Sequence, residues 1–196
     1  MVQKLITIDC DNVLSDTTRS FVKYFSKLHE NQVMFEDISN GYMTRDQIFG
    51  LPEEKMFDIY LEFMHDMHEE CGLPPLVGAV AWVKRLPDAW YRLKVLSWRR
   101  DLFLPMTQKR ITHYFGNMFE DVIFTNDMTE QRRTKWEICR ELGVDIHFDD
   151  FTEYALTIAQ EKIPTLLFDM PRNSTYTWDN EHIIKISGRE QVPEHI

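Results

Sequence analysis

Short apolar runs alternate with segments of helical periodicity over the second half of the chain. The runs are residues 93–97, 122–125, 146–148 and 165–168, and residues 183–186 form a weaker one. The segments before and between these runs place apolar residues three and four positions apart, as one face of a helix requires. These segments are 77–85, 104–115, 133–142 and 152–161. This alternation predicts an α/β fold with a Rossmann-like parallel sheet and helices on both faces.

The first apolar run, residues 4–8, is separated from the others by a helical region. Residues 19–29 and 53–71 have the periodicity of helices, and no convincing strand lies between residues 16 and 75. We therefore predict a small helical unit, 16–75, inserted after the first strand. Residues 1–15 and 76–196 would together form the α/β core.

Two carboxylates, Asp9 and Asp11, directly follow the first run. Ligands of open α/β sheets bind outside the carboxyl ends of the strands. Acids so close together raise one another's pKa unless a cation lies between them, and oxygen ligands of this kind suit Mg²⁺. Taken alone, the stretch is equally compatible with an ordinary Asx turn or helix cap.

Three further polar residues occupy comparable positions. Ser97 and Asp149 each end an apolar run, and Lys135 lies near the start of a helix. Because parallel strands end at one edge of the sheet, we expect these residues to converge on Asp9. Ser97 as a strand-end cap remains an alternative, and so does a solvated basic face at residues 132–135.

The segments DCDNVL, VLSWR, the helix of Lys135 and IHFDD resemble, in this order, the four motifs of the haloacid dehalogenase-like phosphohydrolases. The resemblance implies that Asp9 is a nucleophile forming an aspartyl-phosphate, and that Asp11 is the general acid and base. Ser97 and Lys135 would bind the phosphoryl group. Mg²⁺ would be held by Asp9, the backbone carbonyl of Asp11, and Asp149.

Two positions depart from the commonest pattern of that superfamily. Asn12 stands where most relatives have glycine, but asparagine tolerates the left-handed backbone conformation. The fourth motif begins with two aspartates, and either Asp150 or Glu153 would support the metal site.

The segment LFDMPRN, which follows the run 165–168, resembles the cytosolic 5'(3')-deoxyribonucleotidase-like family. The helical insertion resembles the small C1-type cap of such enzymes. The resemblance implies Mg²⁺-dependent hydrolysis of deoxynucleoside or nucleoside monophosphates. Arg172 stands where many members have an aromatic residue. This difference affects the expected substrate more than the assignment to the family.

A nucleotide substrate needs a surface for its base. Stacking on an aromatic side chain contributes about 1–3 kcal/mol per base. Phe25, Tyr42 and Phe49 of the insertion are candidates, although they could equally form its core. Arg99 is placed to reach phosphate or sugar, or to pair with Asp101.

Composition limits the partners. The net charge of −10 without a basic stripe argues against a nucleic-acid polymer. The cysteines (Cys10, Cys71 and Cys139) lack metal-site spacing, and no apolar run approaches the roughly 18 residues of a membrane span. We expect a soluble, cytoplasmic monomer or homodimer.

The alternatives to a nucleotidase are a phosphatase of the same fold acting on a phosphosugar or other small phosphorylated metabolite, and a binding protein of low turnover. The preserved motif residues argue against the second.

Overall fold

A six-stranded parallel sheet forms the centre of the molecule, with strand order β3-β2-β1-β4-β5-β6. The strands are β1 (Lys4–Ile8), β2 (Tyr91–Ser97), β3 (Asp121–Phe124), β4 (Ile146–Asp149), β5 (Thr165–Phe168) and β6 (Ile183–Ile186). The structure is a computed structural model that describes residues 3–29, 33–39, 45–69, 73–86, 90–127, 129–170, 173–174, 180–188, 191–192 and 196. The predicted α/β fold is confirmed, including the weak run at 183–186 as an edge strand.

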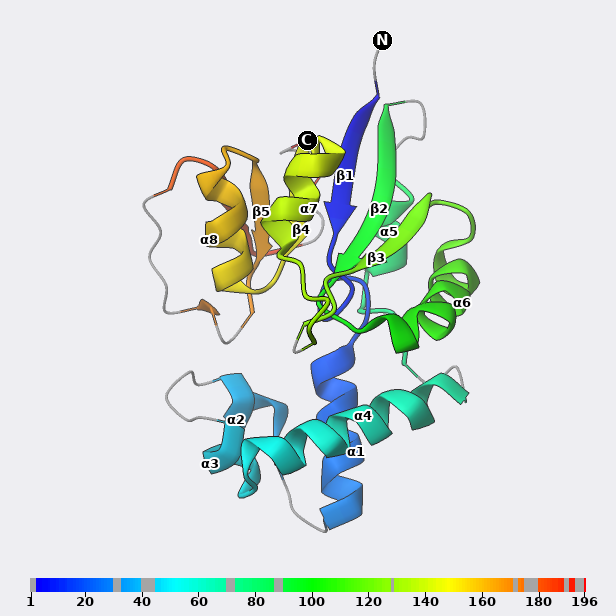
Figure 1. Cartoon of the computed structure of the whole chain (residues 1–196), viewed down its shortest axis with the longest axis vertical. Helices are drawn as coiled ribbons and strands as arrows, with labels where there is room; N and C mark the ends of the chain where they lie inside the picture. Colours follow the sequence, from blue (N-terminus) through cyan, green and yellow to red (C-terminus); the bar gives the residue numbers. More distant parts are fainter. Residues whose placement is uncertain are drawn as a thin grey trace.

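Helices cover both faces of this sheet. They are α5 (Ala79–Val83), α6 (Leu104–Phe115, after the 3₁₀ turn η1, Asp101–Phe103), α7 (Lys135–Leu142) and α8 (Thr152–Gln160). In Figure 1, α7 and α8 lie on the near face and α5 on the far face. The central strands are therefore buried on both sides, which explains why they appear as continuous apolar runs in the sequence.

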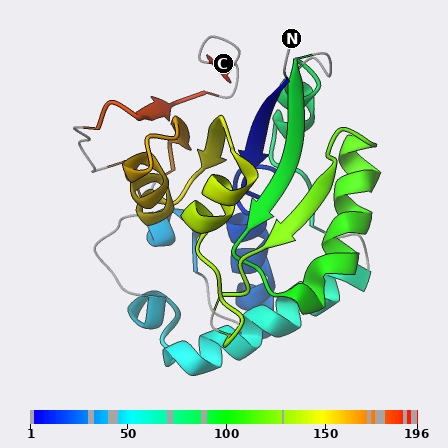
Figure 2. The ribbon, with the colours of Figure 1, turned by 45° about the horizontal axis from the view of Figure 1, so that its top comes forward.

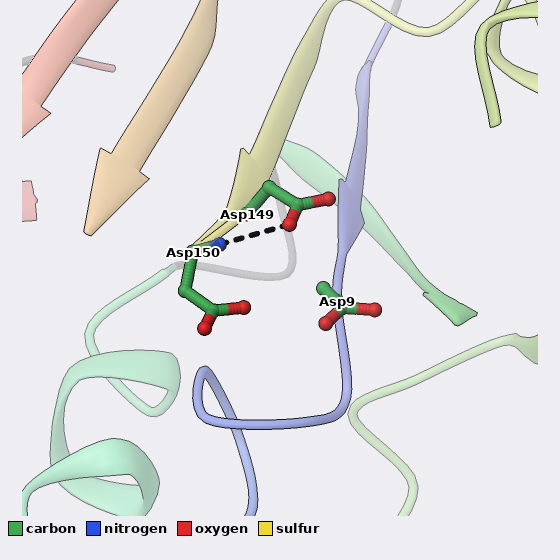
Figure 3. Close-up of side chains that lie close together, drawn as sticks. All are labelled: Asp9, Asp149 and Asp150. Atoms are coloured by element: carbon green, nitrogen blue, oxygen red, sulfur yellow. Dashed lines mark hydrogen bonds between the residues drawn. The ribbon is translucent and has the colours of Figure 1, made fainter. Parts of the chain in front are cut away.

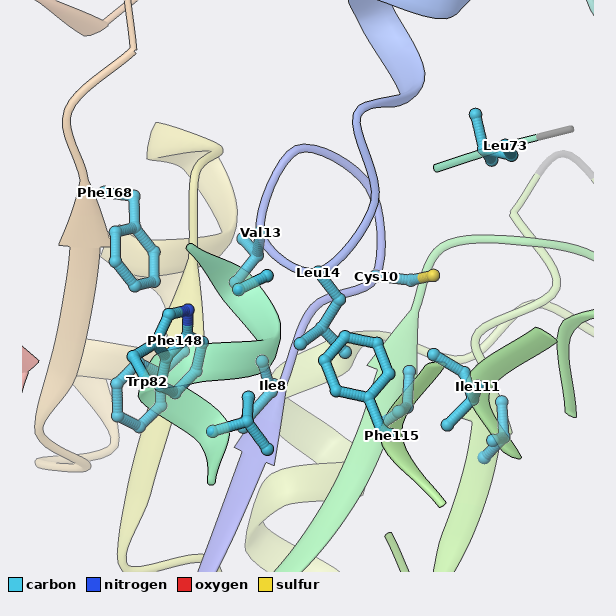
Figure 4. Close-up of a cluster of buried hydrophobic side chains, with 14 of the residues drawn as sticks. Ile8, Cys10, Val13, Leu14, Leu73, Trp82, Ile111, Phe115, Phe148 and Phe168 are labelled. Carbon is cyan, nitrogen blue, oxygen red and sulfur yellow. The ribbon is translucent and has the colours of Figure 1, made fainter. Parts of the chain in front are cut away.

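Alternate residues of β1 contribute to different apolar clusters. Leu5 packs with Ile138 and Ile158 of α7 and α8, whereas Ile6 and Ile8 belong to the cluster on the opposite face. In that second cluster the Trp82 ring of α5 stacks on Phe148 with 5.5 Å between centroids (Figure 4). Phe148 in turn stacks on Phe168 at 6.1 Å. The aromatic stack thus fixes the ends of β4 and β5 near the carboxyl edge.

The helices between β1 and α5 form a separate layer beyond the carboxyl ends of the strands (Figures 1 and 2). They are α1 (Thr17–His29), α2 (Phe35–Ser39), α3 (Arg45–Phe49) and α4 (Glu53–Glu69). The sequence pattern predicted α1 and α4 but missed α2 and α3, because five residues are too few to establish a helical period. The aromatic ring of Phe21 packs against Phe25, Phe49, Tyr60 and Phe63 and forms the core of this layer.

Two neighbouring backbone segments connect the insertion to the sheet. The amide of Asp16 donates to the carbonyl of Pro74 at 3.0 Å, and the amide of Leu76 donates to that of Leu14 at 2.9 Å. Ser15 and Pro75 form an isolated antiparallel bridge between them. These crossings lie at the predicted boundaries of the 16–75 unit, and the domain division itself stays a prediction.

Local sequence signals determine the backbone conformation of the turn after β1 and the two ends of α7. Asn12 has a φ of 61°, the left-handed conformation expected for it. Thr134 caps α7: its side chain accepts from the amide of Glu137, whose carboxylate accepts from the Thr134 amide at 2.9 Å. Gly143, with φ 65° and ψ 49°, ends that helix. The capping box makes Lys135 the first helical residue.

None of the helices in the described ranges combines the length and the apolar character that crossing a lipid bilayer requires.

We expect Leu166→Ala to lower the free energy of unfolding by about 2–5 kcal/mol, because it leaves a cavity at a fully buried position of β5. Leu102→Ala is the matched control, since that side chain is 61% exposed, and its effect should stay within about 0.5 kcal/mol. Urea unfolding followed by circular dichroism measures both. Equal stability of the two variants would contradict the assignment of this core.

Candidate functional site

Lys135 joins two of the predicted acids at the carboxyl edge. Its Nζ donates to Asp9 Oδ1 at 2.8 Å and to Asp149 Oδ2 at 2.7 Å, and its side chain is 0% exposed. Burial opposes its charge, but Asp149 and Asp9 together raise the pKa of Lys135 above its ordinary value. The ammonium group is therefore a fixed positive charge between the ends of β1 and β4.

The Asp149 carboxylate accepts four hydrogen bonds. The amides of Asp150 and Phe151 donate to Oδ1 at 2.9 and 2.8 Å. Lys135 reaches Oδ2, and His147 Nε2 lies 2.9 Å from the same atom. Burial opposes ionisation, but Lys135 and His147 hold the pKa of Asp149 well below its usual range. Protein donors thus fill the acceptor positions of this carboxylate.

Asp9, Asp149 and Asp150 lie close enough to share a cation. One carboxylate oxygen from each falls within 4.8 Å of the others, and all three residues are buried (Figure 3). Burial raises the pKa of Asp9 well above its usual value, Lys135 opposes this, and the neighbouring acids add to it. Three acids face one lysine here, so the site has excess negative charge and only hard oxygen donors. That donor set fits Mg²⁺.

The two residues that the sequence left open as supports of the metal site have different surroundings. Asp150 belongs to the group of three, and the Asn12 amide donates to its Oδ2 at 3.2 Å. Glu153 is exposed on α8 and is not part of the group.

Asp11 points toward a different set of partners. Arg99 donates to both carboxylate oxygens, with Nε 3.0 Å from Oδ2 and Nη2 2.5 Å from Oδ1. Thr17 Oγ1 donates at 2.5 Å, and Ser97 Oγ lies 3.4 Å from Oδ2. Burial raises the pKa of Asp11, but Arg99 and Thr17 outweigh it and lower the pKa to about 2. The predicted acid/base and the predicted phosphate ligand Ser97 are therefore neighbours.

Arg99 does not pair with Asp101, which was one of its two predicted roles. Asp101 instead exchanges hydrogen bonds with Asn126, at 2.8 and 2.9 Å. The guanidinium of Arg99 is buried on Asp11, and its Nη1 donates to Thr107 Oγ1 at 2.9 Å. In this conformation each nitrogen of Arg99 has a partner, and its guanidinium orients the carboxylate of Asp11.

Phe25 and Phe49, two of the three aromatic candidates of the insertion, are not arranged for base stacking. Phe25 and Phe49 are 1% and 4% exposed and pack edge-on, with 4.7 Å between their centroids. Stacking requires an accessible ring face, so these two rings are correctly described as core of the insertion. Tyr42 lies outside the described residues. A different ring, that of Tyr60 on α4, packs against Trp98, the residue that follows β2, with 5.4 Å between the ring centroids.

Asn173, the last residue of LFDMPRN, has a structural role. Its buried side-chain amide donates to the carbonyl of Asp150 at 3.0 Å and to that of Phe168 at 2.8 Å. Its Oδ1 accepts from the amide of Met170 at 3.0 Å. The side chain therefore ties the end of β5 to the loop that carries Asp150.

Comparison with solved structures identifies the fold of the chain. No family model matches the chain, and no curated protein matches it either. Solved structures do match. A haloacid dehalogenase-like hydrolase from Streptococcus pneumoniae superimposes with a TM-score of 0.63 at 12% identity, covering 98% of each chain. The fold is that of haloacid dehalogenase-like hydrolases.

Two other structures with the haloacid dehalogenase-like fold are similar to the chain. A protein from Lactobacillus plantarum, named as a phosphoglycolate phosphatase, has a TM-score of 0.66 at 12% identity and covers 99% of both chains. CbbY from Rhodobacter sphaeroides, in complex with phosphate, has a TM-score of 0.61 at 14% identity, covering 97% of this chain and 96% of its own. These neighbours do not support the narrower resemblance to deoxyribonucleotidases.

Several residues of the site were missed by the sequence analysis. His147 and Thr7 form a buried pair behind Asp149, with 2.8 Å between Nδ1 and Oγ1. The available signal was polarity within otherwise apolar strands, since Thr7 and His147 interrupt the runs of β1 and β4. Arg110 on the buried face of α6 offers the same kind of signal.

We expect Asn173→Ala to lower the free energy of unfolding by about 1–3 kcal/mol, because it leaves buried carbonyls without their donor. Asn117→Ala, at an exposed position after α6, is the matched control. Urea unfolding measures both, and equal stability of the two variants would rule out the structural role of Asn173.

Proposed function

We propose that this chain is a Mg²⁺-dependent phosphomonoesterase that acts through an aspartyl-phosphate. The observation that carries the proposal is the bridge of Lys135 between Asp9 and Asp149, beside the three clustered carboxylates. A nucleophile, a fixed cation and a set of hard oxygen ligands are the groups that phosphoryl transfer requires. Their arrangement at the carboxyl edge of a haloacid dehalogenase-like fold supports this chemistry.

Asp9 is the proposed nucleophile. One of its oxygens would attack phosphorus and displace the alcohol, while the other keeps its hydrogen bond to Lys135. Water then attacks the phosphorus of the aspartyl-phosphate, which releases inorganic phosphate and restores the Asp9 carboxylate. Lys135 offsets negative charge that develops on the phosphoryl oxygens during both displacements.

Asp11 is the proposed acid and base, and its partners set a condition on that role. Both of its oxygens accept hydrogen bonds, from Arg99 and from Thr17. With Ser97 Oγ also 3.4 Å from Oδ2, four hydrogen bonds occupy the acceptor positions of this carboxylate and leave none for a proton. At least one donor must therefore withdraw before Asp11 can protonate the leaving oxygen and later accept a proton from water.

The proposed magnesium ligands are Asp9, Asp150 and the backbone carbonyl of Asp11. Asp149 already accepts four hydrogen bonds, so we assign it to orienting Lys135 and the turn of Asp150. When bound, the ion would neutralise charge between the nucleophile and the phosphate.

The substrate we propose is a small phosphorylated metabolite. Two neighbours in the fold comparison carry names that fit this class, a phosphoglycolate phosphatase and a protein in complex with phosphate. The nucleotidase prediction rested on LFDMPRN and on aromatic rings of the insertion. Asn173 has a structural role, and Phe25 and Phe49 are buried, so neither feature now favours a nucleotide.

Asp9→Asn should reduce phosphate release by roughly a thousandfold or more, because the neutral amide cannot form the covalent intermediate. Asp58→Asn, on the exposed side of α4, is the control and should retain wild-type turnover. Phosphate release from p-nitrophenyl phosphate measures both. Full activity of Asp9→Asn would exclude this mechanism.

A substrate panel tests the class of substrate. Phosphorylated hydroxy acids, sugar phosphates, and ribo- and deoxyribonucleoside monophosphates would each be assayed with Mg²⁺ and with EDTA. We expect Mg²⁺-dependent release from the small metabolites and a loss of activity with EDTA. Preference for deoxynucleotides would restore the nucleotidase prediction. A thermal shift with phosphorylated ligands but no product would favour the low-turnover binding protein.

A further inference from the structure

Arg110 is a buried guanidinium with too few partners. It lies on α6, is 3% exposed, and its Nη2 donates to Cys10 Sγ at 3.4 Å. Sulfur is a weak acceptor. Its Nε and Nη1 are buried and have no hydrogen-bond partner among the described residues. Buried polar groups are rarely left in this state unless a water or ligand completes them.

The hydroxyl of Tyr60 shares this property and comes from the opposite unit. It is buried without a hydrogen-bond partner in the described part of the chain. Burial raises the pKa of Tyr60 well above its ordinary value, and the charges of Asp11, Arg99 and Arg110 also act on it. The ring itself lies against Trp98, the residue after Ser97. Helix α4, which carries Tyr60, packs against α6, which carries Arg110, so the two unpartnered groups come from helices in contact.

The charges in this interior do not balance. Two guanidinium groups, Arg99 and Arg110, are buried there, and Asp11 is the one carboxylate that the described ranges place within ion-pair distance of either. Burial and the charge of Arg99 lower the pKa of Arg110, but a guanidinium remains protonated in proteins. A buried cation without a counter-charge is strongly destabilising. A water molecule would complete the N–H groups but would not supply the missing negative charge.

We propose that Arg110 and Tyr60 form a subsite for a second anionic group of the substrate, a carboxylate or a second phosphate. This inference rests on the proposed phosphatase function and narrows its substrate to molecules with two anionic groups. Arg110 comes from the core and Tyr60 from the helical insertion, so both units contact this group. Arg99 stays committed to Asp11 and Thr107.

Binding can be tested without any turnover. Thermal unfolding would be followed with sodium malonate and with sodium chloride at equal ionic strength. We expect malonate to raise the Tm of the wild type and of Lys109→Met, which removes an exposed charge from the same helix. Arg110→Met should lose this response, and Tyr60→Phe should show a smaller one. An unresponsive wild type, or an equal response of Arg110→Met, would overturn the subsite.

Stability provides a second reading of the same variants. Without added anion, Arg110→Met should unfold at a Tm no lower than the wild type, because it removes an uncompensated buried charge. A large loss of stability would show that Arg110 is satisfied within the protein and would overturn the proposal. Tyr60→Phe keeps the ring packing and provides an independent test of malonate binding.

Turnover distinguishes the subsite from the phosphatase function. We would compare 2-phosphoglycolate with 2-hydroxyethyl phosphate, which has a neutral hydroxymethyl group in place of the carboxylate. The ratio of their kcat/KM values should fall about tenfold or more in Arg110→Met, as expected for loss of a charged hydrogen bond. Lys109→Met should keep the wild-type ratio, and an unchanged ratio in Arg110→Met would contradict the proposal. If the wild type hydrolyses neither these two compounds nor p-nitrophenyl phosphate, the proposed function fails while the malonate experiment still decides the subsite.

Discussion

The arrangement of this molecule depends on the burial of one ammonium group among carboxylates. Asp9, Asp149 and Asp150 place oxygens within 4.8 Å of one another in an interior where like charges repel strongly. Lys135 offsets part of that repulsion by contacting two of them. The capping box at Thr134 fixes where α7 begins. Because Lys135 is the first residue of α7, the capping box also positions its ammonium group relative to the ends of the strands. A local helix signal therefore determines the long-range electrostatics of the site.

A polar network extends from this charge into the sheet. Thr7 and His147 are direct partners in the β1–β4 register and also join through their side chains. His147 continues to Asp149, and Asp149 to Lys135 and Asp9. Slippage of β1 against β4 would break the network, because its members would leave buried polar atoms unpaired. The same residues that prepare the site thus specify how the two central strands pair.

The sequence predicted best those features that depend on local pattern. The strands 165–168 and 183–186 and the helix 104–115 have the predicted bounds, because apolar periodicity and flanking turns define them. The convergence of Asp9, Lys135 and Asp149 followed from the rule that parallel strands end at one edge. The partner of Arg99 did not follow, since Asp11 is 88 residues away and the rotamer depends on packing by α6 and α1. The roles of Asn173 and Arg110 were not predicted for the same reason, since they depend on which atoms surround these side chains in the fold.

The paired backbone segments at Ser15 and Pro75 have a consequence for how such a chain can diversify. The polypeptide leaves and re-enters the sheet through two hydrogen-bonded points, so the spacing between the ends of the inserted segment is set independently of its length. Lengthening that loop adds only a slowly growing entropic cost. A lineage is therefore able to replace the helical layer while the edge of the sheet that carries Asp9 and Asp149 keeps its connectivity. The two parts of one polypeptide can then change at different rates.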